Sequence, residues 1–182
     1  MRLFIAIRMD EEMKKALLGA QDALRSQGIS GLYAPETNFH LTLAFIGEYP
    51  EPDAVQSVLQ SVPLPPMTLR LDGYGSFGRA WWMGLTPNAA LTAYADKLRE
   101  AMKQAGIPFD PRPFVPHISL LFHPTGAASP DGLPLPQPHT GMAVSRVSLL
   151  RSDPGLNGMI YTELSNVSST TADQLSSRQS II

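Results

Sequence analysis

The chain has 182 residues, a formal net charge of −2, 16% charged residues and no cysteine. The absence of cysteine excludes disulfides, thiolate nucleophiles and cysteine-ligated metal sites. Without a basic surplus, the chain is a poor match for proteins that grip long duplexes by neutralising phosphates, so a nucleic-acid partner would be held locally, at an end or as a small fragment.

The N-terminal segment predicts a buried strand followed by a helix. Leu3–Ile7 is apolar, but Arg8 and Asp10–Glu12 make this run too short for a signal peptide or a membrane span. Asp10 is a suitable N-cap for a helix to about residue 27, which Gly28 would end. We therefore expect a soluble, cytoplasmic protein.

The middle of the chain alternates strands and helices. Residues 28–38 predict a connection, 39–46 a strand closed by Gly47, and 53–61 a short helix. Strands are expected at 67–71 and 81–85, and Asn88 would cap a second long helix that ends near Gly106.

The order of helix, connection and histidine-containing strand then repeats. A second such strand is predicted at 115–122, a surface loop at 124–139, and a closing hairpin from 142–150 and 159–164. The repeat predicts one domain, 1–164, with two pseudo-symmetric lobes. Residues 165–182 are rich in Ser and Thr without periodicity, and we expect a poorly ordered tail there.

Two short motifs carry the chemistry: His40-Leu41-Thr42-Leu43 and His117-Ile118-Ser119-Leu120. In a strand, residues i and i+2 share a face, so each histidine should point the same way as the hydroxyl two places on. The same alternation predicts that the opposite, core-facing rows are Leu41, Leu43 and Phe45 in one strand and Ile118, Leu120 and Phe122 in the other.

Two imidazoles and two hydroxyls in one cleft suit proton transfer at a phosphate. An imidazole with an ordinary pKa of about 6.5 serves either as a base or as an acid near neutral pH. Thr42 and Ser119 would donate to the non-bridging phosphate oxygens. The near-symmetry of the motifs leaves open which histidine is the acid.

The motifs and their flanks resemble the RNA 2′,3′-cyclic phosphodiesterases (LigT or ThpR type) of the two-histidine phosphoesterase superfamily. The resemblance covers about residues 2–164 and is carried by four segments: 2–7, 38–48, 79–84 and 114–120. It implies a bilobal α+β fold, with antiparallel sheets around a central cleft and helices outside. It also implies metal-independent hydrolysis of RNA 2′,3′-cyclic phosphate ends to 2′-phosphates, with no cofactor, His40 as proton donor and His117 as proton acceptor.

The second motif departs from the family pattern. Ser119 stands where Thr is usual and keeps the hydroxyl. Phe122 stands where family members commonly carry an Arg. By parity His123 shares a face with His117 and would partly replace that charge, although we favour surface roles for His123 and His139.

Other chemistry-bearing residues have ordinary structural interpretations. We expect Trp81 and Trp82 to be core, and nothing in the spacing of Tyr33 or Phe39 separates base contact from packing. Arg112 either reaches substrate phosphate or is a solvated loop charge. No carboxylate adjoins either motif to complete a metal site, and residues 73–78 lack the Lys-Ser/Thr ending of a Walker-type loop.

Three functions remain from the sequence. The first is the cyclic phosphodiesterase, acting as a monomer on RNA 3′ ends or nucleotides without a membrane or protein partner. The second is a 2′-5′ RNA phosphodiesterase or ligase with the same histidines. The third is a catalytically weak RNA-end or nucleotide-binding protein.

Overall fold

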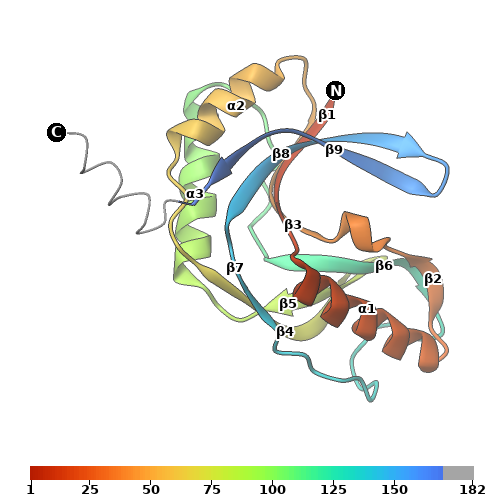
Figure 1. Ribbon diagram of the computed structural model, residues 1–182. Helices are drawn as coiled ribbons and strands as arrows, with labels where there is room; N and C mark the ends of the chain where they lie inside the picture. Colours follow the sequence, from red (N-terminus) through yellow and green to blue (C-terminus); the bar gives the residue numbers. More distant parts are fainter. Residues whose placement is uncertain (170–182) are drawn as a thin grey trace.

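The structure, a computed structural model, describes residues 1–169 (Figure 1). It has the predicted α+β class, with every strand pair antiparallel. In chain order the elements are β1 (Arg2–Arg8), α1 (Glu11–Ser26), β2 (Ser30–Tyr33), the 3₁₀ helix η1 (Glu36–Asn38), β3 (His40–Glu48), α2 (Pro52–Ser61), β4 (Thr68–Phe77), β5 (Ala80–Leu85), α3 (Ala89–Gln104), β6 (His117–Thr125), β7 (Gly141–Ala143), β8 (Arg146–Gly155) and β9 (Gly158–Ser168).

The sheet consists of two halves joined at one residue pair. The strand order is β7-β4-β5-β6-β3-β1-β8-β9, with β2 alongside β6. β3 and β6 meet only at Leu41 and Ile118, whereas the other neighbours pair over several residues. The predicted pseudo-symmetric lobes are the two halves of this nine-stranded path, which meet between the two histidine motifs.

Each half contains the predicted repeat of helix, connection and histidine strand, with one further strand before the helix. β1, α1 and β3 in one half correspond to β5, α3 and β6 in the other. The predicted caps are present: Asp10 accepts a hydrogen bond from the Met13 amide, and Asn88 accepts one from the Leu91 amide. None of the helices in residues 1–169 is long and apolar enough to cross a bilayer.

The helices cross between the halves. α1 contacts β6, and α3 contacts β3 (Figure 1). Their apolar faces, including Leu17 and Leu98, are fully buried in the main core. Each long helix therefore covers the histidine strand of the other half and fixes the angle between the lobes.

Two boundaries predicted from sequence are wrong. Residues 28–38 are not simply a connection, because β2 pairs with β6 through Leu32 and Tyr33. The expected tail also begins too early: β9 continues to Ser168, where residues without apolar periodicity are held by the main-chain ladder to β8. The rest of that prediction, residues 170–182, lies outside the described residues.

Candidate active site

His40 opens β3 with its ring orientation fixed by the main chain. Its Nδ1 lies 2.7 Å from the Asn38 carbonyl oxygen, and its Nε2 lies 3.0 Å from Thr42 Oγ1. A carbonyl oxygen only accepts, so Nδ1 carries the proton and donates it to Asn38. In the neutral ring Nε2 is thus an acceptor, and the Thr42 hydroxyl donates to it.

His117 repeats this arrangement at the start of β6. Its Nδ1 lies 2.6 Å from the Val115 carbonyl oxygen, again the residue two places before the histidine. The same tautomer follows, with Nε2 as the reactive nitrogen. Among residues 1–169, nothing forms a hydrogen bond with this Nε2, so the two copies differ in the hydroxyl contact that His40 makes with Thr42.

The antiparallel pairing brings both motifs to one face. The Leu41–Ile118 pair, extended by one residue on each side, puts His40 across from Ser119 and Thr42 across from His117. All four side chains are half-buried, while Leu41 and Ile118 are completely buried on the opposite face. The structure therefore brings together all four residues that the motifs predicted.

Each histidine lies against two aromatic rings. The His40 ring centroid is 5.0 Å from that of Phe4 and 5.2 Å from that of Tyr161. For His117 the partners are Phe77 at 5.1 Å and Trp82 at 5.6 Å. These aromatic pairs limit ring rotation and exclude water from one side of each imidazole.

Trp82 corrects one sequence prediction. Trp81 is core, at 1% exposure, but Trp82 is half-buried on the cleft face beside His117. Its ring lies so close to Gly75 of β4 that a Cβ at this glycine would overlap it. The Trp82 indole fits beside β4 because this position is a glycine.

A β-bulge in each histidine strand reverses the predicted face of the residue five places after the histidine. The ladder to β1 skips Leu43, and the ladder between β5 and β6 skips Leu120. Leu43 and Ala44 are both buried, as are Leu120 and Leu121. Beyond each bulge the alternation restarts, so Phe45 and Phe122 face the cleft instead of the core.

Helix side chains bind the carbonyl groups at the two bulges. Gln21 of α1 donates to the Leu120 carbonyl at 2.9 Å, and Arg99 of α3 donates through Nε to the Leu43 carbonyl at 3.1 Å. A bulged residue is left out of regular ladder pairing, so its polar groups need other partners. The crossed helices thus stabilise the backbone that aims Phe45 and Phe122.

The cleft lowers the pKa of both imidazoles. Burial lowers the pKa of His40 to about 4, against the opposing effect of the Asn38 carbonyl, and the nearby positive charges of His117 and Arg8 lower it further. Burial also lowers the pKa of His117, although the Val115 carbonyl acts in the opposite direction. Arg8 is the direct partner of His40 across β1 and β3.

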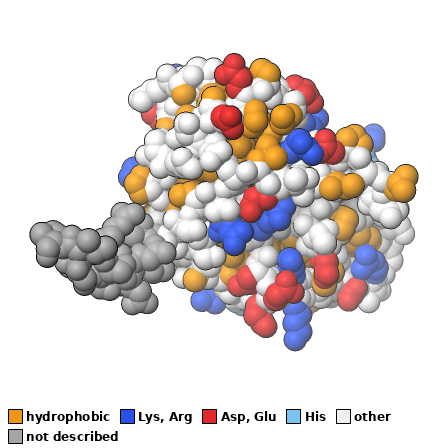
Figure 2. All heavy atoms as spheres, turned by 45° about the horizontal axis from the view of Figure 1, so that its top comes forward, with side chains coloured by type: hydrophobic (Ala, Val, Ile, Leu, Met, Phe, Trp, Pro, Cys, Tyr) orange, Lys and Arg blue, Asp and Glu red, His pale blue; other side chains and the backbone are white. Residues whose placement is uncertain are grey.

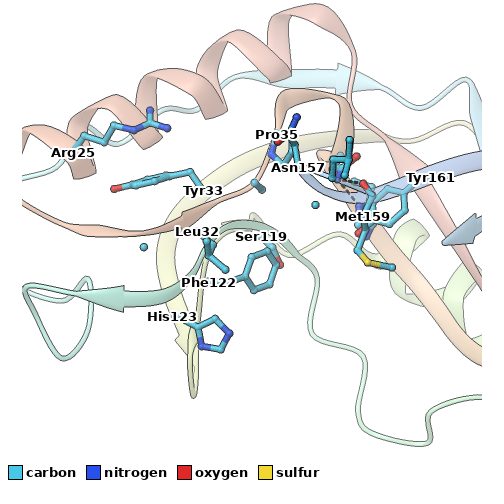
Figure 3. A pocket seen from close by; sticks show the side chains of 16 residues that line it. Arg25, Leu32, Tyr33, Pro35, Ser119, Phe122, His123, Asn157, Met159 and Tyr161 are labelled. Carbon is cyan, nitrogen blue, oxygen red and sulfur yellow. Dashed lines mark hydrogen bonds between the residues drawn. The ribbon is translucent and has the colours of Figure 1, made fainter. Parts of the chain in front are cut away.

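Two cavities lie on either side of His40. The larger, about 950 Å³, is bordered by His40 and Ser119 and extends between the β2–β6 pair and the β8–β9 hairpin (Figure 3). The smaller, about 710 Å³, is bordered by His40, Thr42 and Phe45. Each cavity therefore contains the hydroxyl of one motif and the phenylalanine that follows it.

The remaining candidates fall outside the pair of motifs. Arg112 forms an ion pair with Asp110, with 2.5 Å between Nη2 and Oδ2, and borders neither cavity. It is therefore a paired loop charge. His139 is exposed, and its carbonyl binds Arg70. Phe39 is core, whereas Tyr33 borders the larger cavity with Arg25 over its ring.

His123 also borders the larger cavity, but not by strand parity. The bulge at Leu120 breaks that alternation, and His123 has a φ of 51°, in the left-handed region. Within the described part of the chain, no three His, Asp or Glu side chains converge as a metal site would require.

The comparisons with known proteins agree with this geometry. A model of the 2′-5′ RNA ligase superfamily matches residues 16–155. The RNA 2′,3′-cyclic phosphodiesterase of Escherichia coli is 32% identical over 168 residues, covering 90% of this chain and 93% of the relative. The one from Geobacillus stearothermophilus is 30% identical over 82% of this chain, which spans only 52% of that relative's length.

Solved structures give the same result. E. coli LigT in its apo form has a TM-score of 0.80 at 29% identity, covering 93% of this chain and 98% of LigT. LigT complexed with 3′-AMP has a TM-score of 0.79 at 28% identity over the same shares of the two chains.

Proposed function

This chain belongs to the 2′-5′ RNA ligase superfamily, and on that premise we propose that it hydrolyses RNA 2′,3′-cyclic phosphate ends to 2′-phosphates. The observation that carries the proposal is the pair of oriented imidazoles. His40 and His117 start adjoining strands on one face, and each presents Nε2 because its Nδ1 is bound to a main-chain carbonyl.

In the proposed reaction His117 Nε2 takes a proton from water, whose oxygen attacks phosphorus. The bond from phosphorus to the ribose 3′ oxygen breaks, and His40 Nε2–H gives its proton to that oxygen. His117 gains one proton and His40 loses one, so the net charge of the two histidines does not change. The starting state returns when His117 releases its proton to solvent and His40 takes one up. The two histidines perform both proton transfers without a metal ion or cofactor.

Thr42 and Ser119 would hold the phosphate between the histidines. Their hydroxyls share the cleft face with both rings, and hydroxyl donors stabilise the charge that develops on non-bridging oxygens. The Thr42 hydroxyl is bound to His40 in the free protein. Substrate would therefore redirect it from the imidazole to phosphate.

The proposed substrate is a terminus, which a single chain can hold. Acidic and basic side chains are interspersed on the face shown in Figure 2, and the net charge is −2. Such a surface favours local contacts over long-range attraction to a duplex. Since both histidines come from one chain, we propose that the protein acts as a monomer, which light scattering tests. We also propose that it binds RNA ends in the cytoplasm, which localisation of the tagged protein tests.

Product analysis tests the reaction. An oligoribonucleotide with a 2′,3′-cyclic phosphate should give a 2′-phosphate, with or without EDTA. His40→Ala and His117→Ala should each reduce the rate about 10²- to 10⁴-fold, and thermal unfolding should show that each variant is still folded. A 3′-phosphate product would reverse the leaving group. Binding of the RNA without hydrolysis by the wild-type protein would identify a binding protein, and loss of activity in EDTA would show that a metal takes part.

A second candidate function is favoured by the smaller cavity. It lies on the Thr42 side of His40 and includes Phe45, with Arg2 over its ring at 5.0 Å. This cavity has room for a second nucleoside, so a 2′-5′-linked dinucleotide is a second proposed substrate, in cleavage or in ligation. Comparing the rate on such a dinucleotide with the rate on the cyclic end decides between the two.

A further inference from the structure

The larger cavity has an apolar mouth made by separate elements. Leu32 of β2 is 66% exposed and Phe122 of β6 is 40% exposed. Across the cavity, Met159 lies on β9 (Figure 3). Leu156, at the β8–β9 turn, also borders the cavity and is fully exposed. Apolar side chains that gather around a cavity, rather than singly on a surface, mark a place where a ligand is held.

The backbone directs Phe122 into this position. Without the bulge at Leu120, alternation would bury Phe122 in the core, as the sequence predicts. With it, Leu121 is fully buried and Phe122 borders the cavity. The left-handed φ of His123, whose amide is bound to the Arg79 carbonyl at 2.8 Å, then interrupts the extended backbone within β6 directly after the ring. An aromatic ring is thus held in a half-exposed position, where a solvent-facing strand residue would normally be polar.

The cavity adjoins the residues of the proposed reaction. His40 and Ser119 both border the cavity. Phe122 lies three residues along β6 from Ser119 (Figure 3). A phosphate at the histidines would leave its ribose, and the base on that ribose, in this space. Its volume of about 950 Å³ is at the upper end of ordinary ligand sites and accommodates a nucleoside.

We propose that this cavity binds the nucleobase of the terminal nucleotide by stacking on Phe122. This rests on the proposed function for the position of the phosphate. Every base has a π-face, so the site accepts all four, with purines preferred for their larger ring area. Asn157, at the hairpin tip across the cavity, contributes an amide that donates to or accepts from a base edge (Figure 3). Recognition is thus by the last base, not by a run of upstream phosphates.

The test compares a substrate that has a base with one that lacks it. The probes are adenosine 2′,3′-cyclic phosphate and 1-O-methylribose 2,3-cyclic phosphate, each assayed with wild type, Phe122→Ala and Phe122→Trp. For wild type, kcat/KM should favour the adenosine compound about 5- to 150-fold, mainly through KM. Phe122→Ala should bring this ratio close to one, and Phe122→Trp should keep it. Ile160→Ala is the matched control, because Ile160 is 56% exposed on β9 but borders neither cavity.

The outcomes separate the two proposals. If Phe122→Ala slows both compounds equally, or the ratio persists, stacking on Phe122 is refuted while the hydrolase remains. If wild type hydrolyses neither compound, the proposed function fails. Calorimetry with adenosine 2′-phosphate and 1-O-methylribose 2-phosphate then tests the base site without turnover: tighter binding of the nucleotide that depends on Phe122 supports it, and equal binding refutes it.

Discussion

Replacing His40 by Asn should alter how the free energy of unfolding depends on pH. Burial lowers the pKa of His40 from 6.5 to about 4. As pH falls below 6.5, the unfolded chain therefore takes up this proton before the folded protein does. The stability due to the neutral ring is fully present above 6.5 and is lost progressively as pH falls toward about 4.

The size of the effect follows from the shift. The full difference between 6.5 and about 4 corresponds to about 3 kcal/mol, and between about pH 7.5 and about pH 5 the wild type should lose about 2 kcal/mol through this group. Asn keeps an amide donor near the position of Nδ1 for the Asn38 carbonyl but does not titrate. The stability of His40→Asn should thus fall about 2 kcal/mol less over that range.

Urea unfolding followed by tryptophan fluorescence at the two pH values measures this difference. His139→Asn is the comparison, because it removes an exposed histidine outside both cavities. If the wild type and His40→Asn lose stability in parallel, the buried neutral imidazole is the wrong description of His40. An NMR titration of the His40 ring in the folded wild type gives the same answer directly.

Four further predictions follow from the site. Since both imidazole pKa values are lowered, kcat/KM should have a bell-shaped pH dependence with its maximum on the acidic side of neutrality, and a maximum above pH 7 would contradict this. Arg8→Gln removes a positive charge beside His40, so its pKa should rise and the acidic limb should move up in pH. Gly75→Ala places a Cβ into the Trp82 ring and should cost about 1–3 kcal/mol of stability in urea unfolding, whereas unchanged stability would mean that the indole has room to move. Arg99→Met leaves the bulge carbonyl of β3 without its side-chain donor and should cost about 1–3 kcal/mol, which equal melting curves would refute.

Strand alternation predicted which face each residue of β3 occupies correctly as far as the first bulge. His40 and Thr42 share the cleft face, and Leu41 and Leu43 face the core, because up to this point the strand is regular. The prediction for Phe45 is wrong, since the bulge inserts one residue. The consecutive apolar pair Leu43-Ala44, repeated as Leu120-Leu121 in the other motif, is the signal in the sequence that could have indicated a change of face.

The rings around the histidines were not predictable from local patterns. Tyr161 lies 121 residues from His40 in sequence but 5.2 Å from it in space, because β3, β1, β8 and β9 are successive strands of one sheet. Trp82 faces the cleft only because Gly75 leaves room in the neighbouring strand. Contacts of this kind depend on which strands become neighbours, and periodicity within one strand carries no information about that.

The pseudo-symmetric fold and the asymmetric chemistry are compatible because the two imidazoles have different surroundings. Burial lowers the pKa of both rings, that of His40 to about 4, so both imidazoles are neutral near pH 7 in the free protein and His40 takes up the proton it donates only once substrate is bound. A bound phosphate anion raises the pKa of both rings, and a donor whose pKa stays low is the stronger acid toward a departing alkoxide. Once His40 has given up its proton, the Thr42 hydroxyl again donates to Nε2 and stabilises the neutral ring, as in the free structure. The proposed donor role of His40 therefore depends on a contact that the second motif lacks in the free protein, and Thr42→Val should slow leaving-group departure more than Ser119→Ala does.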